Sequence, residues 1–178
     1  MARFTTNIRT DRKGLEALKK TIAKLRESPS YVRVGLLGDS KKNTRKGDGL
    51  TNGQLGLIHE FGTSTIPARP FLRPVMNARA DEYQTILANI AKRALDTKGS
   101  SRDRDLGLLG QKAAADVKNY ITQGNPIPPP NAPATIARKE KKRRRGSTGS
   151  VRTLVDTGRM VAAITHQVVK TPKKGKTK

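Results

Sequence analysis

The residues that come closest to a catalytic pattern are the neighbours His59 and Glu60 and an Asp-Thr-Gly triplet at 156–158. A His-Glu pair forms part of a zinc-protease site when a second histidine stands at the position that Thr63 holds here. An Asp-Thr-Gly triplet serves aspartic proteases, in which two such aspartates share a proton, but this chain carries a single copy. Neither pattern therefore predicts an enzyme.

Other patterns for cofactor or metal binding are incomplete. Gly47, Gly49 and Gly53 miss the spacing of a dinucleotide-binding loop, and the full phosphate-loop pattern is absent. The chain has no cysteine, and its 14 acidic residues are scattered, so neither a thiolate metal site nor a two-metal nuclease is indicated. His166 alternates with apolar neighbours and is expected on one face of a strand, as a packed or a surface histidine. We expect no enzyme activity, no cofactor and no bound metal.

The segment 58–74 is unusually rigid for a connection between helices. Each of its prolines fixes its own φ and biases the preceding residue toward extended geometry. Two apolar anchors lie between the prolines, and two arginines four positions apart are candidates for holding contacts of the loop or of a neighbouring subunit. The stiffening, anchoring and basic residues are Pro67, Pro70, Pro74, Phe71, Leu72, Arg69 and Arg73.

Apolar spacing predicts the elements that position these segments. Residues 15–25 have the period of an amphipathic helix, and the β-branched run 31–37 indicates a strand. A short helix that Asn52 caps should end at Gly62, and the longest helical pattern follows one face from 75 to 95, roughly 35 Å. The other expected elements are a strand at 3–9, a helix over 106–121, a short helix that Asp156 caps, and a strand at 165–169.

The order of these elements predicts an α+β fold, with a small antiparallel sheet packed against two or three helices. Residues 1–122 and 151–169 are expected to form one core domain. Residues 123–150 contain five of the ten prolines and a strongly basic run, so they are expected to form a long extended arm. Residues 170–178 are expected to form a disordered basic tail.

The formal net charge of +23 is concentrated in two short segments. Residues 138–145 hold seven basic residues and one acid, and residues 170–178 hold five basic residues and no acid. Such a balance favours a polyanion or acidic proteins as neighbours. No apolar run approaches the roughly 18–20 residues needed to span a bilayer, so we expect a soluble protein made in the cytoplasm.

Two motifs, taken together, carry a family resemblance. The first is Glu60-Phe-Gly62 followed by Pro67-Ala-Arg-Pro-Phe-Leu72. The second is Pro130-Asn-Ala-Pro-Ala-Thr-Ile-Ala-Arg-Lys139 followed, after a basic insert, by Leu154-Val-Asp-Thr-Gly-Arg-Met160. In this order they resemble the signatures of neck and tail-completion proteins of long-tailed DNA bacteriophages, the virion morphogenesis family. The resemblance covers roughly residues 31–169 and is weakest over 99–124 and in the basic insert.

The resemblance implies a structural virion protein, a head–tail joining subunit of the phage neck. Copies, about six or twelve, would form a ring around the DNA channel between the connector and the tail tube. Its partners would be other copies of itself, connector or head-completion proteins, tail-terminator or tail-tube proteins, and non-specifically the packaged DNA. Its location would be the virion, after synthesis in the host cytoplasm, with no membrane contact.

Candidate residues follow from the motifs and from the charge. The implied structural and assembly contacts are Glu60, Phe61, Gly62, Pro67, Arg69, Pro70, Phe71, Leu72, Asp156, Thr157 and Gly158. The basic candidates for contact with DNA or an acidic partner are Lys41, Lys42, Arg45, Lys46, Arg138, Lys139, Lys141, Lys142, Arg143, Arg144, Arg145, Lys173 and Lys174.

The sequence is also compatible with a different class of function, a free-standing basic protein that binds nucleic acid. The net charge supports it. Against it, Tyr31 is the single aromatic residue of the strand expected at 31–37, which leaves little surface on which bases could stack.

Overall fold

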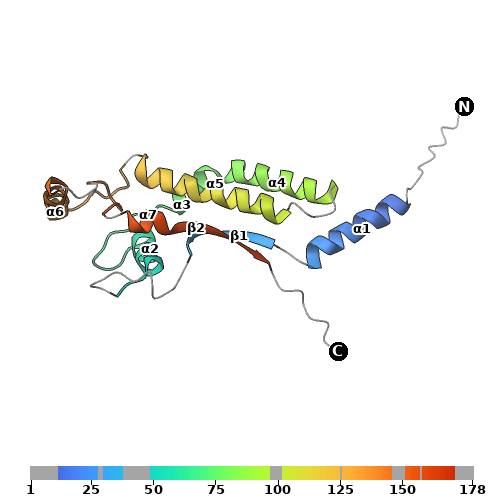
Figure 1. Cartoon of the computed structure of the whole chain (residues 1–178), viewed down its shortest axis with the longest axis horizontal. Helices are drawn as coiled ribbons and strands as arrows, with labels where there is room; N and C mark the ends of the chain where they lie inside the picture. The colour runs from blue at the N-terminus through green and yellow to red at the C-terminus, as the bar shows by residue number, and fades with distance from the viewer. Residues whose placement is uncertain are drawn as a thin grey trace, which may run out of the picture.

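The computed structural model describes residues 12–27, 30–37, 49–96, 102–124, 126–145, 151–156 and 158–170. Within these ranges the chain forms seven helices and a two-stranded antiparallel sheet, so the predicted α+β class is confirmed (Figure 1). The elements are α1 (Arg12–Glu27), β1 (Ser30–Leu36), α2 (Asn52–Phe61), α3 (Arg73–Ala78), α4 (Ala80–Asp96), α5 (Arg102–Thr122), α6 (Pro133–Arg144), α7 (Arg159–Ala163) and β2 (Ile164–Lys170).

The sheet joins two strands from opposite ends of the chain. Ser30 pairs with Lys170 at one end of the register, and Leu36 pairs with Ile164 at the other. The helix α5 packs closely on this sheet, because a Cβ at Gly110 would lie 2.5 Å from a Val32 methyl carbon and 2.7 Å from the His166 ring. Glycine is therefore required at this contact. His166 lies on one face of β2, as predicted, and there it is packed against α5 rather than left at the surface.

The main core lies where α3, α5, α7 and the sheet meet. Phe71, Val117 and Ile164 are fully buried, and Val75 and Met160 join the same cluster. Each such side chain stabilises the fold by roughly 1.5–3 kcal/mol relative to an exposed one. A smaller cluster of Ile90, Leu106 and Leu109 holds α4 against α5.

The predicted single helix over 75–95 is wrong, because the chain breaks at Arg79 into α3 and α4. Arg79 has φ −113° and ψ 13°, outside helical geometry. Val75 of α3 lies in the main core, whereas Ile90 of α4 lies in the smaller cluster. The Arg79 guanidinium also bonds Glu82 at 2.9 Å, across the first turn of α4.

The cap of α2 also differs from the prediction. Thr51, rather than Asn52, is the N-cap, and its hydroxyl accepts a bond from the Gln54 backbone N–H while the Gln54 side chain accepts from the Thr51 N–H. This reciprocal pair satisfies two N–H groups, one more than a single cap would satisfy. The predicted end of α2 at Gly62 is confirmed.

An extended arm over 123–150 is not what the structure has at 133–144, where the chain forms α6 (Figure 1). Pro133 occupies the first turn of this helix, where its fixed φ and missing N–H cost nothing. The Ala, Lys, Arg and Glu residues that follow are good helix formers, so local preference and the starting proline agree. The strand expected at 3–9, the rest of the arm at 146–150 and the tail at 171–178 lie outside the described residues.

The helix α1 forms as predicted and stands at the opposite end of the molecule from α6 (Figure 1). Its apolar residues Leu15, Leu18 and Ile22 are 45%, 46% and 38% exposed. The amphipathic pattern therefore made a helix without placing that helix in the core.

Candidate functional site

The carboxylate of Glu60 organises the first motif. It is 3% exposed, and its Oε2 accepts bonds from the backbone N–H of Phe71 at 2.8 Å and of Leu72 at 3.0 Å. Its Oε1 accepts from both the backbone N–H and the Nε of Arg73, each at 3.1 Å. The chain entering α3 thus has its N–H groups satisfied by a side chain from the end of α2.

These bonds decide the charge of Glu60. Burial raises the pKa of the carboxyl group, but the N–H groups of Leu72, Phe71 and Arg73 favour the anion and leave the pKa below its ordinary value. Glu60 is therefore ionised near neutral pH. A structural contact was expected of Glu60, but its role as the acceptor for these backbone N–H groups was not predicted from the sequence. The signal was available, since Arg73-Pro74 opens a helix and Leu72 offers no capping side chain.

The turn between α2 and α3 closes on itself. The Thr63 hydroxyl accepts from the Ile66 N–H at 3.0 Å, and the Arg69 N–H donates to the His59 carbonyl at 2.7 Å. Gly62 has φ 76° and ψ −179°, and a Cβ there would lie 2.8 Å from the Ala68 nitrogen. Only glycine fits at this position.

Arg69 ties this turn to the proline-rich segment before α6. Its Nε donates to the Pro129 carbonyl at 2.8 Å, and one Nη donates to the Pro130 carbonyl at 3.1 Å. Arg69 and Arg73 were expected to hold contacts of the loop or of a neighbouring subunit. Both make contacts of the loop, because Arg73 also bonds the Glu60 carbonyl at 3.0 Å.

The two phenylalanines of the motif have opposite environments. Phe71 fills the main core with no exposed surface. Phe61 is 63% exposed, one helical turn beyond Leu57, which is 60% exposed, and the Arg73 guanidinium lies 5.0 Å from its ring centre. Phe71 therefore belongs to the core of the chain's own fold, whereas Phe61 offers apolar surface to solvent. Pro67 is exposed, and Pro70 and Leu72 are partly buried.

Lys139 is not the surface cation that the sequence predicted. It is 5% exposed, and its Nζ donates to the Arg152 carbonyl at 2.7 Å and the Val155 carbonyl at 2.6 Å. It holds α6 against residues 151–156, with help from Asn131, whose Nδ2 donates to the Val151 carbonyl at 2.9 Å. The physical reason is its position on the inner face of α6, which the run of basic letters does not reveal.

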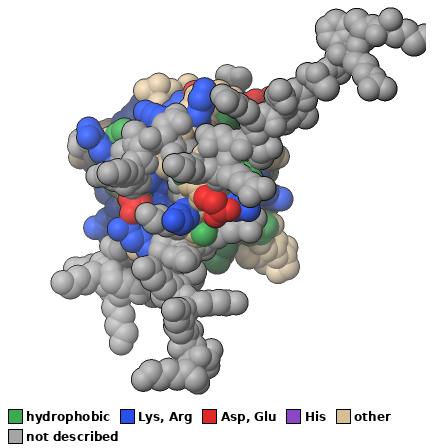
Figure 2. Space-filling view, turned by 90° about the vertical axis from the view of Figure 1, so that its right-hand side faces the viewer, with side chains coloured by type: hydrophobic (Ala, Val, Ile, Leu, Met, Phe, Trp, Pro, Cys, Tyr) green, Lys and Arg blue, Asp and Glu red, His purple; other side chains and the backbone are tan. Residues whose placement is uncertain are grey.

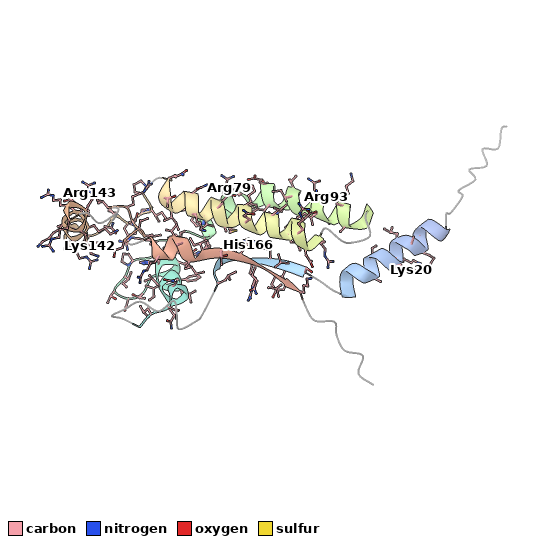
Figure 3. The ribbon with its side chains drawn as sticks, in the orientation of Figure 1. Lys20, Arg79, Arg93, Lys142, Arg143 and His166 are labelled. Atoms are coloured by element: carbon pink, nitrogen blue, oxygen red, sulfur yellow. The ribbon has the colours of Figure 1, made fainter. Side chains whose placement is uncertain are left out.

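The remaining basic residues of α6 do lie at the surface. Lys142 pairs with Asp156 at 3.5 Å, and both Lys142 and Arg143 lie on α6 at one end of the molecule (Figure 3). At the opposite end, lysine and arginine side chains are spread between a few acids rather than gathered in one patch (Figure 2). The exposed basic residues at α6 are Arg138, Lys141, Lys142, Arg143, Arg144 and Arg145.

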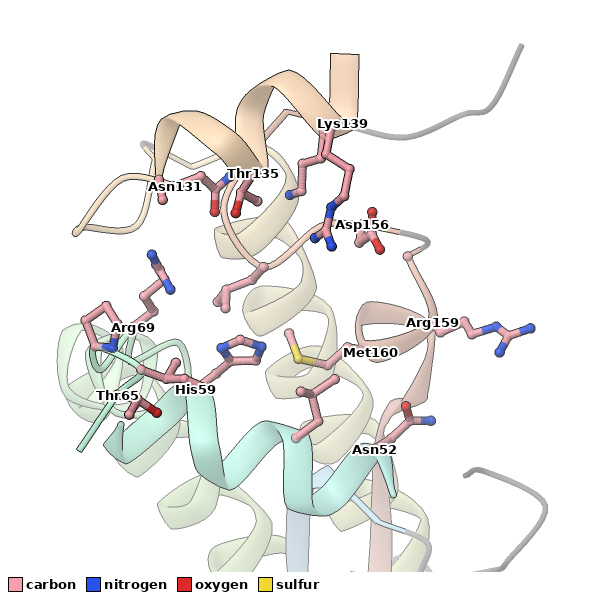
Figure 4. A pocket seen from close by; sticks show the side chains of 17 residues that line it. Asn52, His59, Thr65, Arg69, Asn131, Thr135, Lys139, Asp156, Arg159 and Met160 are labelled. Atoms are coloured by element: carbon pink, nitrogen blue, oxygen red, sulfur yellow. The ribbon is translucent and has the colours of Figure 1, made fainter. Parts of the chain in front are cut away.

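A hollow of about 420 Å³ brings the two motifs together (Figure 4). One wall is α2 and the turn after it, with His59, Pro67 and Arg69. The opposite wall is the start of α6 with Thr135, and the second motif lines the side with Met160. The His59 ring points into this space, while Arg159 points away from it (Figure 4).

The second motif does not cap α7 in the way that the sequence predicted. Asp156 does not cap α7, because Gly158 is the N-cap and no side chain bonds there. Gly158 has φ 73°, a left-handed conformation that suits glycine and turns the chain into the helix. Leu154 adopts φ 63°, which is uncommon for a branched residue, and its side chain lines the hollow.

Several predicted residues lie outside the described part of the chain, so the structure places none of them. They are Thr157, Lys41, Lys42, Arg45, Lys46, Lys173 and Lys174. Among the described residues, no group of three or more His, Asp or Glu side chains is arranged to hold a metal ion. Of the helices that the structure describes, none combines the length and the hydrophobicity that a membrane crossing demands.

Compared with known proteins, the chain matches no protein-family model, no curated protein and no solved structure. The resemblance to the phage neck family therefore depends on the residues of the two motifs alone.

Proposed function

We propose that this protein is a structural subunit of a bacteriophage neck, a tail-completion or head–tail joining protein that assembles as a ring around the DNA channel and is part of the virion. The observation that carries the proposal is the shared hollow. Pro67 and Arg69 of the first motif and Asp156, Gly158 and Met160 of the second line one cavity, although they are far apart in the sequence. Two motifs that resemble one family thus form one structural unit.

The contacts described for this unit are hydrogen bonds that hold segments of the chain in fixed positions. Glu60 caps a chain entry, Arg69 bonds two carbonyls, and Lys139 bonds two more. A rigid unit of this kind suits a subunit that must hold the same geometry in every copy of a ring. We propose no catalytic step and no cofactor.

The exposed apolar pair on α2 is the surface that we assign to contact between subunits. Leu57 and Phe61 lie one turn apart and are 60% and 63% exposed. Large apolar side chains at the centre of an interface commonly carry much of its binding energy. In a ring, this surface would meet a different surface of the next copy.

Assembly is expected to depend on neighbours of opposite charge. A ring multiplies the +23 charge of each chain, and the self-repulsion opposes closure unless acidic proteins or DNA are present. We therefore expect the purified full-length chain to be a monomer or small oligomer in low salt. Rings should form once connector and tail-terminator proteins from the same phage are added.

Native mass spectrometry of these mixtures tests the proposal. Phe61→Ser should abolish the ring with little change in the melting temperature, because Phe61 is already exposed in the monomer. The matched control is Leu108→Ser, which alters an apolar residue of α5 that is 56% exposed. Absence of any ring with all neighbours present would refute the assembly role. Closed rings of the chain alone in low salt would refute the dependence on neighbours.

The exposed basic residues of α6 favour one alternative, a free-standing nucleic-acid-binding protein. If Arg138, Lys141, Arg143, Arg144 and Arg145 each engaged a phosphate, the logarithm of the affinity would fall against that of salt with a slope of about −4.5. Filter binding across a salt series measures this slope. Submicromolar duplex binding by the monomer with such a slope would favour the alternative over the neck subunit.

A further inference from the structure

The hollow between α2 and α6 is rich in positive charge. Arg69, Arg138 and Lys139 line it against a single acid, Asp156. Arg159 also borders the hollow, but its side chain points away from it (Figure 4). Asp156 already pairs with Lys142 outside the hollow, at 3.5 Å. The positive charge of the walls is thus not balanced by the acid that shares them.

Two of these cations keep hydrogen-bonding capacity. Arg138 forms no hydrogen bond or ion pair with any residue in the described ranges. The Nε and one Nη of Arg69 donate to the Pro129 and Pro130 carbonyls, and the second Nη bonds nothing among the described residues. Both side chains therefore have donors left for an anionic ligand.

The lowered pKa of Lys139 is consistent with a positive electrostatic potential in the hollow. Burial is the largest cause of its lowered pKa, Asp156 opposes the shift, and the charges of Arg138 and Arg69 add to it. A carboxylate entering the hollow would relieve this repulsion.

The other half of the lining is apolar. Leu55, Ile66, Leu154 and Met160 contribute side chains to the walls, and no Phe, Tyr or Trp does so. A nucleic acid would find nothing on which to stack its bases beyond the ring of His59. The volume of about 420 Å³ lies within the range of about 300–1,000 Å³ that is usual for ligand sites.

We infer that this hollow binds an acidic peptide segment of a partner protein, with a carboxylate at Arg69 and Arg138 and an apolar side chain against Leu55 and Leu154. The segment comes from a partner, because the chain itself carries 37 basic and only 14 acidic residues. The inference extends the proposed function, since such a segment is a means by which a neighbour in the neck could attach.

Fluorescence anisotropy on the full-length chain tests the inference, with a labelled peptide of alternating glutamate and leucine. A peptide of equal charge with glycine in place of leucine should bind about tenfold more weakly, because it leaves the apolar wall uncovered. Arg138→Ala should weaken binding of the leucine peptide about fivefold. Arg143→Ala, on the same helix but outside the hollow, should change it less than about twofold.

Three results would overturn the inference. The first is equal weakening by Arg138→Ala and Arg143→Ala, which would indicate diffuse attraction to α6. The second is equal affinity for the two peptides, or no binding of either. The third is displacement of the leucine peptide by a single-stranded oligonucleotide whose own binding needs Arg138, which would assign the hollow to nucleic acid.

These outcomes are separable from the proposed function. Rings that form with neighbours while the peptide tests fail would refute only the acidic-peptide site. Peptide binding as expected with no ring under any condition would refute only the neck role.

Discussion

Glu60 and Lys139 are two buried charged side chains that the backbone satisfies in opposite ways. Glu60 accepts bonds from three backbone N–H groups and from the Arg73 guanidinium. Lys139 donates to the carbonyls of Arg152 and Val155. Each joins segments that would otherwise end in unsatisfied backbone groups.

The difference lies in how well each charge is stabilised. The pKa of Glu60 falls below its usual value although burial raises it, so the N–H bonds outweigh the loss of hydration. Lys139 also has a lowered pKa, chiefly through burial, which for a lysine means that the charged form is disfavoured. The contact of Glu60 with residues 71–73, which we call the Glu60 junction, is therefore expected to contribute strongly to global stability. The contact of Lys139 is expected mainly to fix the position of α6.

Phe71→Ala tests the apolar packing of the Glu60 junction separately from its hydrogen bonds. The variant keeps the backbone N–H of residue 71, which donates to Glu60. We expect a loss of about 3–5 kcal/mol in the free energy of unfolding, measured by urea denaturation, since the ring is fully buried. The control is Phe61→Ala, at a ring that is 63% exposed, and it should cost less than about 1 kcal/mol. Similar losses for both would mean that the core placement of Phe71 is wrong.

Glu60→Gln tests the hydrogen bonds of the Glu60 junction. Glutamine keeps the shape of the side chain but turns one acceptor into a donor that faces backbone N–H groups, so we expect a loss of about 2–4 kcal/mol. Denaturation by urea again gives the value. Glu82→Gln, at an exposed carboxylate of α4, should leave the midpoint close to that of the unaltered chain. A neutral effect of Glu60→Gln would contradict a stabilising role of the buried anion.

Lys139→Met examines the other charge. It removes a poorly solvated ammonium but leaves two carbonyls unsatisfied, so the net loss should be about 1–2 kcal/mol. Faster amide hydrogen exchange should appear in α6 before it appears in α5. Lys141→Met, on the exposed side of α6, is the control and should leave exchange unchanged. Faster exchange throughout the core would show that Lys139 stabilises the whole fold.

The smallest expected effect is a pH dependence of the Glu60 contribution. The folded-state pKa lies below the ordinary value of 4.5, so the contribution is complete above about pH 4.5 and is lost as pH falls through the lower folded value. The difference in stability between the unaltered chain and Glu60→Gln should therefore shrink on acidification below pH 4.5. A constant difference down to the acid unfolding of both proteins would contradict the lowered pKa.

Local patterns predicted much of the fold. The period of Leu15, Leu18 and Ile22 indicated α1, the run at 31–37 indicated β1, and Gly62 marked the end of α2. These signals are local, because helix period, strand composition and turn residues act within a few positions. They did not reveal that α1 exposes its apolar face, nor that Arg79 separates α3 from α4.

The candidate site was predicted only in part. The motif residues were identified, and the contacts of Arg69 and Arg73 were anticipated. The hollow was not, since its walls come from α2, α6 and the segment before α7. The burial of Lys139 was also missed, because its neighbours Arg138 and Glu140 give no sign of which side of α6 faces inward.

By itself, the sequence determined most helix and strand segments, though not α6 or the break at Arg79. It also determined the rigidity of the proline segment and the large positive charge, since these depend on residue type and short-range spacing. Only the tertiary structure decided that Glu60 is buried and caps the chain entering α3, and that Lys139 is buried and bonds two backbone carbonyls. It also decided that two distant motifs share one hollow. The physical reason is that hydration and hydrogen-bond partners are set by neighbours from other segments, which determine whether a charged side chain binds a partner protein or the backbone of its own chain.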